Sequence, residues 1–132
     1  MRIITGKAKG KKLISPDGYD VTRPTLDRVK QSIFNILQNN LNNDTVVLDL
    51  FAGTGSLGLE ACSRGAKITY LCDRNDVIFS YLKKNIENLG FENSAFAIKG
   101  DKDEPHYLAF IWNIMCAMWT CKNMPELNNY LI

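Results

Sequence analysis

The sequence predicts an α/β fold in which parallel strands alternate with helices. Residues 45–99 alternate between short apolar runs typical of buried strands and longer stretches with helical periodicity. A glycine-rich segment, residues 53–55, directly follows the first apolar run. An acidic residue stands at or just after the end of each predicted strand: Asp49, Asp73 and Asp101. A length of 132 residues suits one domain.

The first twenty residues are predicted to form a basic hairpin or arm. Two partly apolar runs, residues 2–5 and 11–15, are separated by glycines and end at a turn sequence at residues 16–18. Residues 1–40 contain eight Lys or Arg and three Asp, whereas the whole chain has a net charge of +2. A basic arm before a mildly acidic body indicates a polyanionic partner. A solvated charged face is the alternative.

Residues 21–101 are expected to form the core. A helix follows Pro24, because apolar residues recur there at spacings of three and four, which puts them on one face. They are Leu26, Val29, Ile33, Ile36, Leu37 and Leu41. The predicted strands cover residues 45–50, 67–72 and 95–99. Two further helices precede Gly65 and Gly90, which are placed to end them.

The strand, glycine loop and helix at residues 46–58 indicate a ligand site, because ligands bind at the carboxyl ends of strands in open α/β sheets. Gly53, Gly55 and Gly58 also match the dinucleotide fingerprint. Asp49 just before the loop is unhelpful to a pyrophosphate. A carboxylate is favourable beside the ammonium and sulfonium of S-adenosylmethionine (SAM). Asp49 therefore favours SAM over NAD, and a carboxylate that only caps backbone N–H groups of the loop is the alternative.

The acids that end the second and third strands suit the rest of a nucleoside. Asp73 lies at the offset expected of a residue that accepts from ribose hydroxyls, which fits SAM and NAD equally. Its alternative role is to cap the following helix. Asp101 could accept a hydrogen bond from an adenine amino group.

Other classes of site are disfavoured. The chain has four cysteines, with no CxxC pair, and one histidine: Cys62, Cys72, Cys116, Cys121 and His106. This usage predicts a reduced cytosolic protein without a metal site. Its longest apolar stretch, around residues 108–119, is shorter than the ~20 residues that span a membrane. A nuclease or a hydrolase is poorly supported, because the sequence has no carboxylate cluster for Mg²⁺ and no nucleophile elbow.

Seven short segments occur in a fixed order along the first half of the chain, at residues 1–6, 9–13, 22–30, 34–37, 48–55, 58–61 and 63–66. In this order they resemble the signature of the bacterial 16S rRNA (guanine-N2) methyltransferases of the RsmD type. The resemblance implies a Rossmann-like SAM-dependent methyltransferase fold, with a partial parallel sheet flanked by helices and an N-terminal basic hairpin.

The resemblance also implies roles for individual residues. The methionine side of SAM would be lined by Asp49, Phe51, Gly53 and Gly55. Asp73 would hold the ribose, Asp101 would lie near the adenine, and Thr25 would close over the cofactor. Phosphates of small-subunit rRNA, free or in an assembling ribosomal subunit, would be held by Arg2, Lys7, Lys9, Lys11, Lys12, Arg23 and Arg28.

The catalytic tetrapeptide of that family, Asp/Asn-Pro-Pro-aromatic, does not occur here, because no two of the four prolines are adjacent. The catalytic residues are therefore unassigned. Residues 102–132 are expected to be a divergent helical tail on a truncated enzyme. Three parallel strands would leave a sheet edge and part of an apolar face open, which predicts marginal stability or self-association. A non-catalytic SAM- or RNA-binding remnant is the second hypothesis, and an NAD-dependent oxidoreductase the third.

Overall fold

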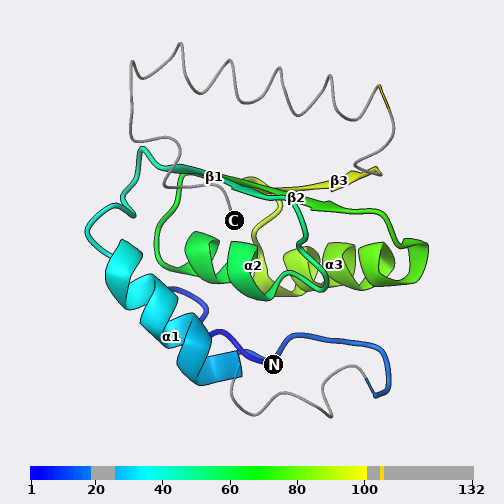
Figure 1. Ribbon diagram of the computed structural model, residues 1–132, viewed down its shortest axis with the longest axis horizontal. Helices are drawn as coiled ribbons and strands as arrows, with labels where there is room; N and C mark the ends of the chain where they lie inside the picture. The colour runs from blue at the N-terminus through cyan, green and yellow to red at the C-terminus, as the bar shows by residue number, and fades with distance from the viewer. Residues whose placement is uncertain (19–25, 101–104, 106–132) are drawn as a thin grey trace.

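The computed structural model describes residues 1–18, 26–100 and 105 of the chain (Figure 1). The elements follow in the order α1 (Leu26–Leu37), β1 (Val46–Asp49), α2 (Ser56–Ser63), β2 (Ile68–Asp73), α3 (Asp76–Leu89) and β3 (Ala95–Lys99). Within that part of the chain, the strands form one parallel sheet in the order β1-β2-β3. The predicted α/β alternation is confirmed, and strand ends differ from prediction by one residue at most.

Some predicted residues lie outside this description. They are the cofactor candidates Thr25 and Asp101, the RNA-binding candidate Arg23, the residues Cys116, Cys121 and His106, and the expected tail at 102–132 apart from residue 105.

The helices α2 and α3 cover one face of the sheet, and the N-terminal arm lies on the other side of these helices (Figure 1). The main core lies between these layers, with Leu59 from α2, Leu71 from β2 and Leu82 from α3 all fully buried. The arm contributes to the same core three buried residues, Ile3, Ala8 and Leu13. The arm is therefore packed against the body of the protein.

The close contact of α2 with β2 depends on Gly58. A Cβ atom at this position would lie 2.5 Å from Cδ2 of Leu71 and 3.2 Å from Cγ2 of Thr69. Both are side chains of the strand beneath, and Leu71 and Thr69 are fully buried. The third glycine of the loop motif thus serves packing between helix and strand.

We expect Gly58→Ala to destabilise the protein by about 1–3 kcal/mol, because an added methyl group overpacks this contact. The higher helix propensity of alanine, ~1 kcal/mol, offsets only part of this loss. Urea unfolding followed by circular dichroism measures the change. Asn88→Ala, at an exposed position of α3, is the control and should stay within about 0.5 kcal/mol of the native chain. Equal stability of Gly58→Ala and the native chain would contradict the close approach.

The arm is a hairpin that docks on the end of α2. Its two runs pair through an antiparallel bridge between Arg2 and Lys12 and through Ile3 N donating to Lys11 O at 2.9 Å. The turn of this hairpin contacts Ser63, whose carbonyl accepts a hydrogen bond from Lys7 N at 2.8 Å. Gly6 has a φ of +92°, and a Cβ atom on it would lie 1.9 Å from the Ser63 carbonyl oxygen, so only glycine fits this approach.

The buried side of α1 differs from the apolar stripe that periodicity indicated. Val29 and Ile36 are 52% and 77% exposed, whereas Lys30 and Phe34 are 1% and 0% exposed. Phe34 packs with Val47 and Ala61. The ammonium group of Lys30 pairs with the buried carboxylate of Glu60. The side of α1 that faces the core therefore differs from its aliphatic stripe, because Lys30 can be buried when its charge is paired in the interior.

No helix in the described ranges is long and apolar enough to cross a membrane. Over the same ranges, no group of three or more His, Cys, Asp or Glu side chains is arranged to hold a metal ion.

Candidate functional site

The glycine loop between β1 and α2 is tied to the end of β2. Oδ2 of Asp73 accepts from Gly53 N at 3.0 Å, and Oδ1 accepts from Asn75 N at 2.9 Å. Ala52 N donates to the Cys72 carbonyl at 2.9 Å. The structure thus brings Asp73 against the glycine loop at the carboxyl edge of the sheet. The alternative role for Asp73 is wrong, because Asn75 caps α3 by accepting from the two backbone N–H groups at Val77 and Ile78.

Asp49 ends β1 and is 2% exposed. Its Oδ1 accepts from Phe51 N at 3.3 Å and its Oδ2 from Gly58 N at 3.2 Å. The capping contacts that the sequence left as an alternative are therefore made. Burial raises the pKa of Asp49 to about 6; the two backbone hydrogen bonds oppose this shift, and the charge of Asp73 adds to it.

The two carboxylates of this edge have no cationic partner among the described residues. Neither Asp49 nor Asp73 forms an ion pair with a Lys, Arg or His in the part of the chain that the structure describes. A buried carboxylate held only by N–H groups retains much of its desolvation cost. A bound cation would lower this cost, whereas a pyrophosphate would be repelled. The edge therefore suits a positively charged ligand.

The loop itself has features that fit a nucleoside cofactor. Gly53 and Gly55 have φ of +58° and +100°. A Cβ atom on Gly55 would lie 2.6 Å from Cδ1 of Leu59, so the fold requires this glycine whether or not a ligand approaches. Phe51 is 77% exposed beside the loop. The hydroxyl of Thr54 is buried and has no hydrogen-bond partner among the described residues, which leaves polar capacity in the loop. These groups fit SAM.

We expect the free energy of unfolding to fall between about pH 4 and pH 6 as Asp49 ionises. Its folded pKa of about 6 lies above the reference value of 3.8. The native state therefore binds the proton of Asp49 more tightly than the unfolded state does. The resulting contribution to the free energy of unfolding is fully present below the unfolded pKa and is lost as the pH rises through the folded pKa. A shift of this size corresponds to about 3 kcal/mol. Urea unfolding across this pH range measures the slope, which should be smaller in Asp49→Ala. A slope unchanged by the substitution would assign it to other acids.

The basic residues of the arm lie at the surface. Four lysines of the hairpin are exposed and form no ion pair within the described ranges: Lys7, Lys9, Lys11 and Lys12. Arg28 on α1 is exposed as well. Arg2 lies 3.4 Å from the carboxylate of Asp27, and both side chains are largely exposed. The arm therefore presents positive charge that is free to meet phosphates.

Sequence reasoning missed a buried ionic network beneath the arm. Glu60 is 0% exposed, and its carboxylate accepts from Ile4 N at 2.9 Å and Thr5 N at 3.0 Å. The same carboxylate binds Nε of Arg64 at 3.0 Å and lies 3.4 Å from Nζ of Lys30. Burial lowers the pKa of Lys30, and the charge of Glu60 opposes that shift. The i, i+4 spacing of Glu60 and Arg64 was the one sequence signal of this network.

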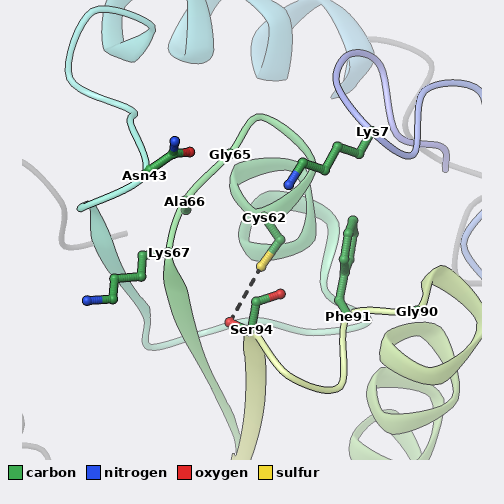
Figure 2. Close-up of a pocket in the computed structure, with 9 residues that line it drawn as sticks. All are labelled: Lys7, Asn43, Cys62, Gly65, Ala66, Lys67, Gly90, Phe91 and Ser94. Atoms are coloured by element: carbon green, nitrogen blue, oxygen red, sulfur yellow. Dashed lines mark hydrogen bonds between the residues drawn. The ribbon is translucent and has the colours of Figure 1, made fainter.

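A cavity of about 350 Å³ lies at the opposite, amino edge of the sheet (Figure 2). Its lining includes Lys7, Lys67, Cys62 and Phe91, and the thiol of Cys62 donates to the Ser94 carbonyl at 3.9 Å. Burial raises the pKa of the Cys62 thiol, so this group is not activated. Because α2 and α3 end here, their carbonyl ends oppose an anion. The cavity contains none of the predicted cofactor residues.

Comparison with known proteins agrees with the predicted family and fold. A family model described as "Conserved hypothetical protein 95" matches residues 1–108. The chain is 38% identical over 117 residues to "Ribosomal RNA small subunit methyltransferase D" of Escherichia coli (strain K12), covering 84% of this chain and 58% of that protein. The chain therefore spans little more than half the length of this relative.

Two solved structures are also similar. The Escherichia coli protein yhhF, described as a candidate methyltransferase, aligns with a TM-score of 0.67 and 39% identity, over 76% of this chain and 52% of that chain. A hypothetical protein of Thermus thermophilus aligns with a TM-score of 0.70 and 27% identity, over 89% of this chain and 62% of that chain. The predicted Rossmann-like methyltransferase fold is thereby confirmed.

Proposed function

Because the chain belongs to the "Conserved hypothetical protein 95" family, we propose that it serves SAM-dependent methylation of small-subunit rRNA at the exocyclic amine of a guanine. A methyltransferase of this kind needs a cofactor pocket and a surface for RNA. Its relative from Escherichia coli is named a ribosomal RNA small subunit methyltransferase. The loop at the carboxyl edge of the sheet would supply the pocket, and the basic arm the surface.

The pair Asp49 and Asp73, which has no cationic partner in the part of the chain that the structure describes, is the observation that carries the proposal. SAM, when bound, supplies a methyl group on a positively charged sulfur. Asp49, Phe51 and the glycines of loop 53–55 would hold the methionine part, and Asp73 the ribose. Thr25 and Asp101 would complete the pocket. The carboxylate of Asp49 would offset the ammonium charge, which also lowers the desolvation cost of that carboxylate.

The basic arm would hold the RNA. Lysine and arginine contacts to phosphates position a nucleic acid without reading its sequence, which is the role we propose for the exposed residues of the arm, with Arg23 and Arg28. The guanine amine is a weak nucleophile, so the enzyme must extrude the base and align it. The family's Asp/Asn-Pro-Pro-aromatic sequence is absent from these 132 residues. The proposed roles of this chain are therefore cofactor and RNA binding.

Titration calorimetry with SAM, and with NAD as the rival ligand, tests the pocket. Saturable SAM binding with no NAD binding is the expected result. A folded chain that binds neither, or that binds only NAD, would overturn the proposal. Transfer of labelled methyl groups from SAM to small-subunit rRNA then measures whether this chain also completes the reaction, and separates an enzyme from a binding protein.

The three-strand sheet also motivates a proposal on association. We propose that the protein is cytoplasmic and that it self-associates through an edge of the three-strand sheet of the described residues, because an unpaired edge strand can pair with another chain. Analytical ultracentrifugation should find a concentration-dependent dimer. A monomer at all concentrations would contradict it.

A further inference from the structure

The side chain of Asn85 joins two segments that lie far apart in sequence. Asn85 is in α3 and is 1% exposed. Its Nδ2 donates to the Ile14 carbonyl at 2.8 Å and to the Thr54 carbonyl at 2.9 Å. Its Oδ1 accepts from Ile14 N at 2.7 Å. Ile14 belongs to the arm and Thr54 is the middle residue of the glycine loop, so one amide group contacts both.

The amide of Asn85 is fully used by these contacts. An asparagine offers two N–H donors, and here one goes to the arm and the other to the loop. Its oxygen returns a bond to the same arm residue, so Ile14 is paired through both its N–H and its carbonyl, as it would be by a neighbouring strand. Neither the arm nor the loop can shift without breaking a hydrogen bond to the buried side chain of Asn85 or moving that side chain.

A second contact links the other end of the arm to the loop. Nζ of Lys30 donates to the Arg2 carbonyl at 2.6 Å and to Oγ of Ser56 at 3.3 Å. Ser56 directly follows Gly55 and begins α2. The arm is thus connected to residues within or next to the glycine loop at both of its ends.

We propose that Asn85 is a positioning residue that couples the docking of an RNA phosphate backbone on the arm to the conformation of loop 53–55. The proposal rests on the proposed function, in which the arm holds RNA and the loop holds the cofactor. RNA that fixes the arm also fixes the Thr54 carbonyl through Asn85. The cofactor then meets a loop that is already ordered, so each ligand strengthens binding of the other.

The test compares SAM affinity with and without a saturating small-subunit rRNA transcript, by titration calorimetry at one low salt concentration. We expect the transcript to tighten SAM binding about fivefold or more, and SAM to tighten transcript binding by the same factor. In Asn85→Ala and Asn85→Asp, which lose both donated bonds, the ratio should approach one. Asn88→Ala, an exposed asparagine of the same helix, should keep the native ratio. A role limited to stability would lower the unfolding temperature and leave the ratio unchanged.

Hydrogen exchange on the native chain needs no variant. The transcript alone, without SAM, should slow exchange of the amides of Gly53 and Gly55, which donate to Asp73 and to the Ala52 carbonyl. A native chain that binds SAM and the transcript independently, or a native ratio retained by Asn85→Asp, would overturn the coupling and leave the proposed function intact. Absence of SAM binding in every condition would instead overturn the proposed function.

Discussion

Replacing Glu60 with alanine is expected to destabilise the protein by about 3–5 kcal/mol, the usual result of removing one partner from a buried ion pair. Lys30 is 1% exposed, and its amine would lose the counter-charge of Glu60 that offsets its burial. The backbone N–H groups of Ile4 and Thr5 would lose their acceptors at the same time. A total stability of about 5–15 kcal/mol is typical of a domain, so this loss would unfold a large fraction of molecules under mild conditions.

Urea unfolding measures this effect, with Glu87→Ala on the exposed surface of α3 as the matched control. The double variant Lys30→Met with Glu60→Gln should be more stable than Glu60→Gln alone, because it removes the buried positive charge together with the negative one. If Glu60→Ala unfolds at the same urea concentration as Glu87→Ala, the network contributes little and another contact anchors the arm.

Asp49→Ala is expected to weaken SAM binding by roughly 30-fold or more, since truncating one partner of a buried charge pair costs about 2–5 kcal/mol. The carboxylate is buried, has a pKa raised to about 6 and has no cation beside it in the described structure. Titration calorimetry near pH 8, where Asp49 is ionised, gives the affinities. Glu92→Ala, an exposed acid in the turn before β3, controls for the loss of a negative charge.

Asp49→Asn separates the two roles of this side chain. The amide keeps the shape and one acceptor for the loop but has no charge. Equal loss of affinity in the alanine and asparagine variants would assign the effect to charge. Native affinity in Asp49→Asn would instead mean that Asp49 acts only as a cap for Phe51 N and Gly58 N.

Apolar periodicity and the placement of glycines predicted most of the helices and strands. The strand, loop and helix around residues 45–65 and the course of α3 follow from apolar periodicity and glycine placement, and they agree with the structure to within a residue or two. The positions of Asp73 and the glycine loop at the ends of their strands were predicted, whereas the hydrogen bond from Gly53 N to Asp73 is a finding of the structure.

Contacts between distant segments could not be predicted. Lysine is by residue type a surface side chain, and only the fold brings Lys30 to Glu60. Asn85 also lies in a helix where its residue type gives no signal, and its partners are 31 and 71 residues away. A polar residue that joins distant segments is recognised from its neighbours in space, and a single sequence does not specify those neighbours.

The docking of the arm also has a consequence for how the protein is made. The arm's hydrogen bonds reach Glu60, Ser63 and Asn85, up to 71 residues later in the chain. At about 5–20 residues per second, the ribosome needs roughly 4–14 s to make the residues between Ile14 and Asn85. During that interval Ile3, Ala8 and Leu13 have no core to enter. The segment that is synthesised first is therefore among the last to dock on the folded protein. A chain arrested before residue 85 would expose a basic, partly apolar N-terminus.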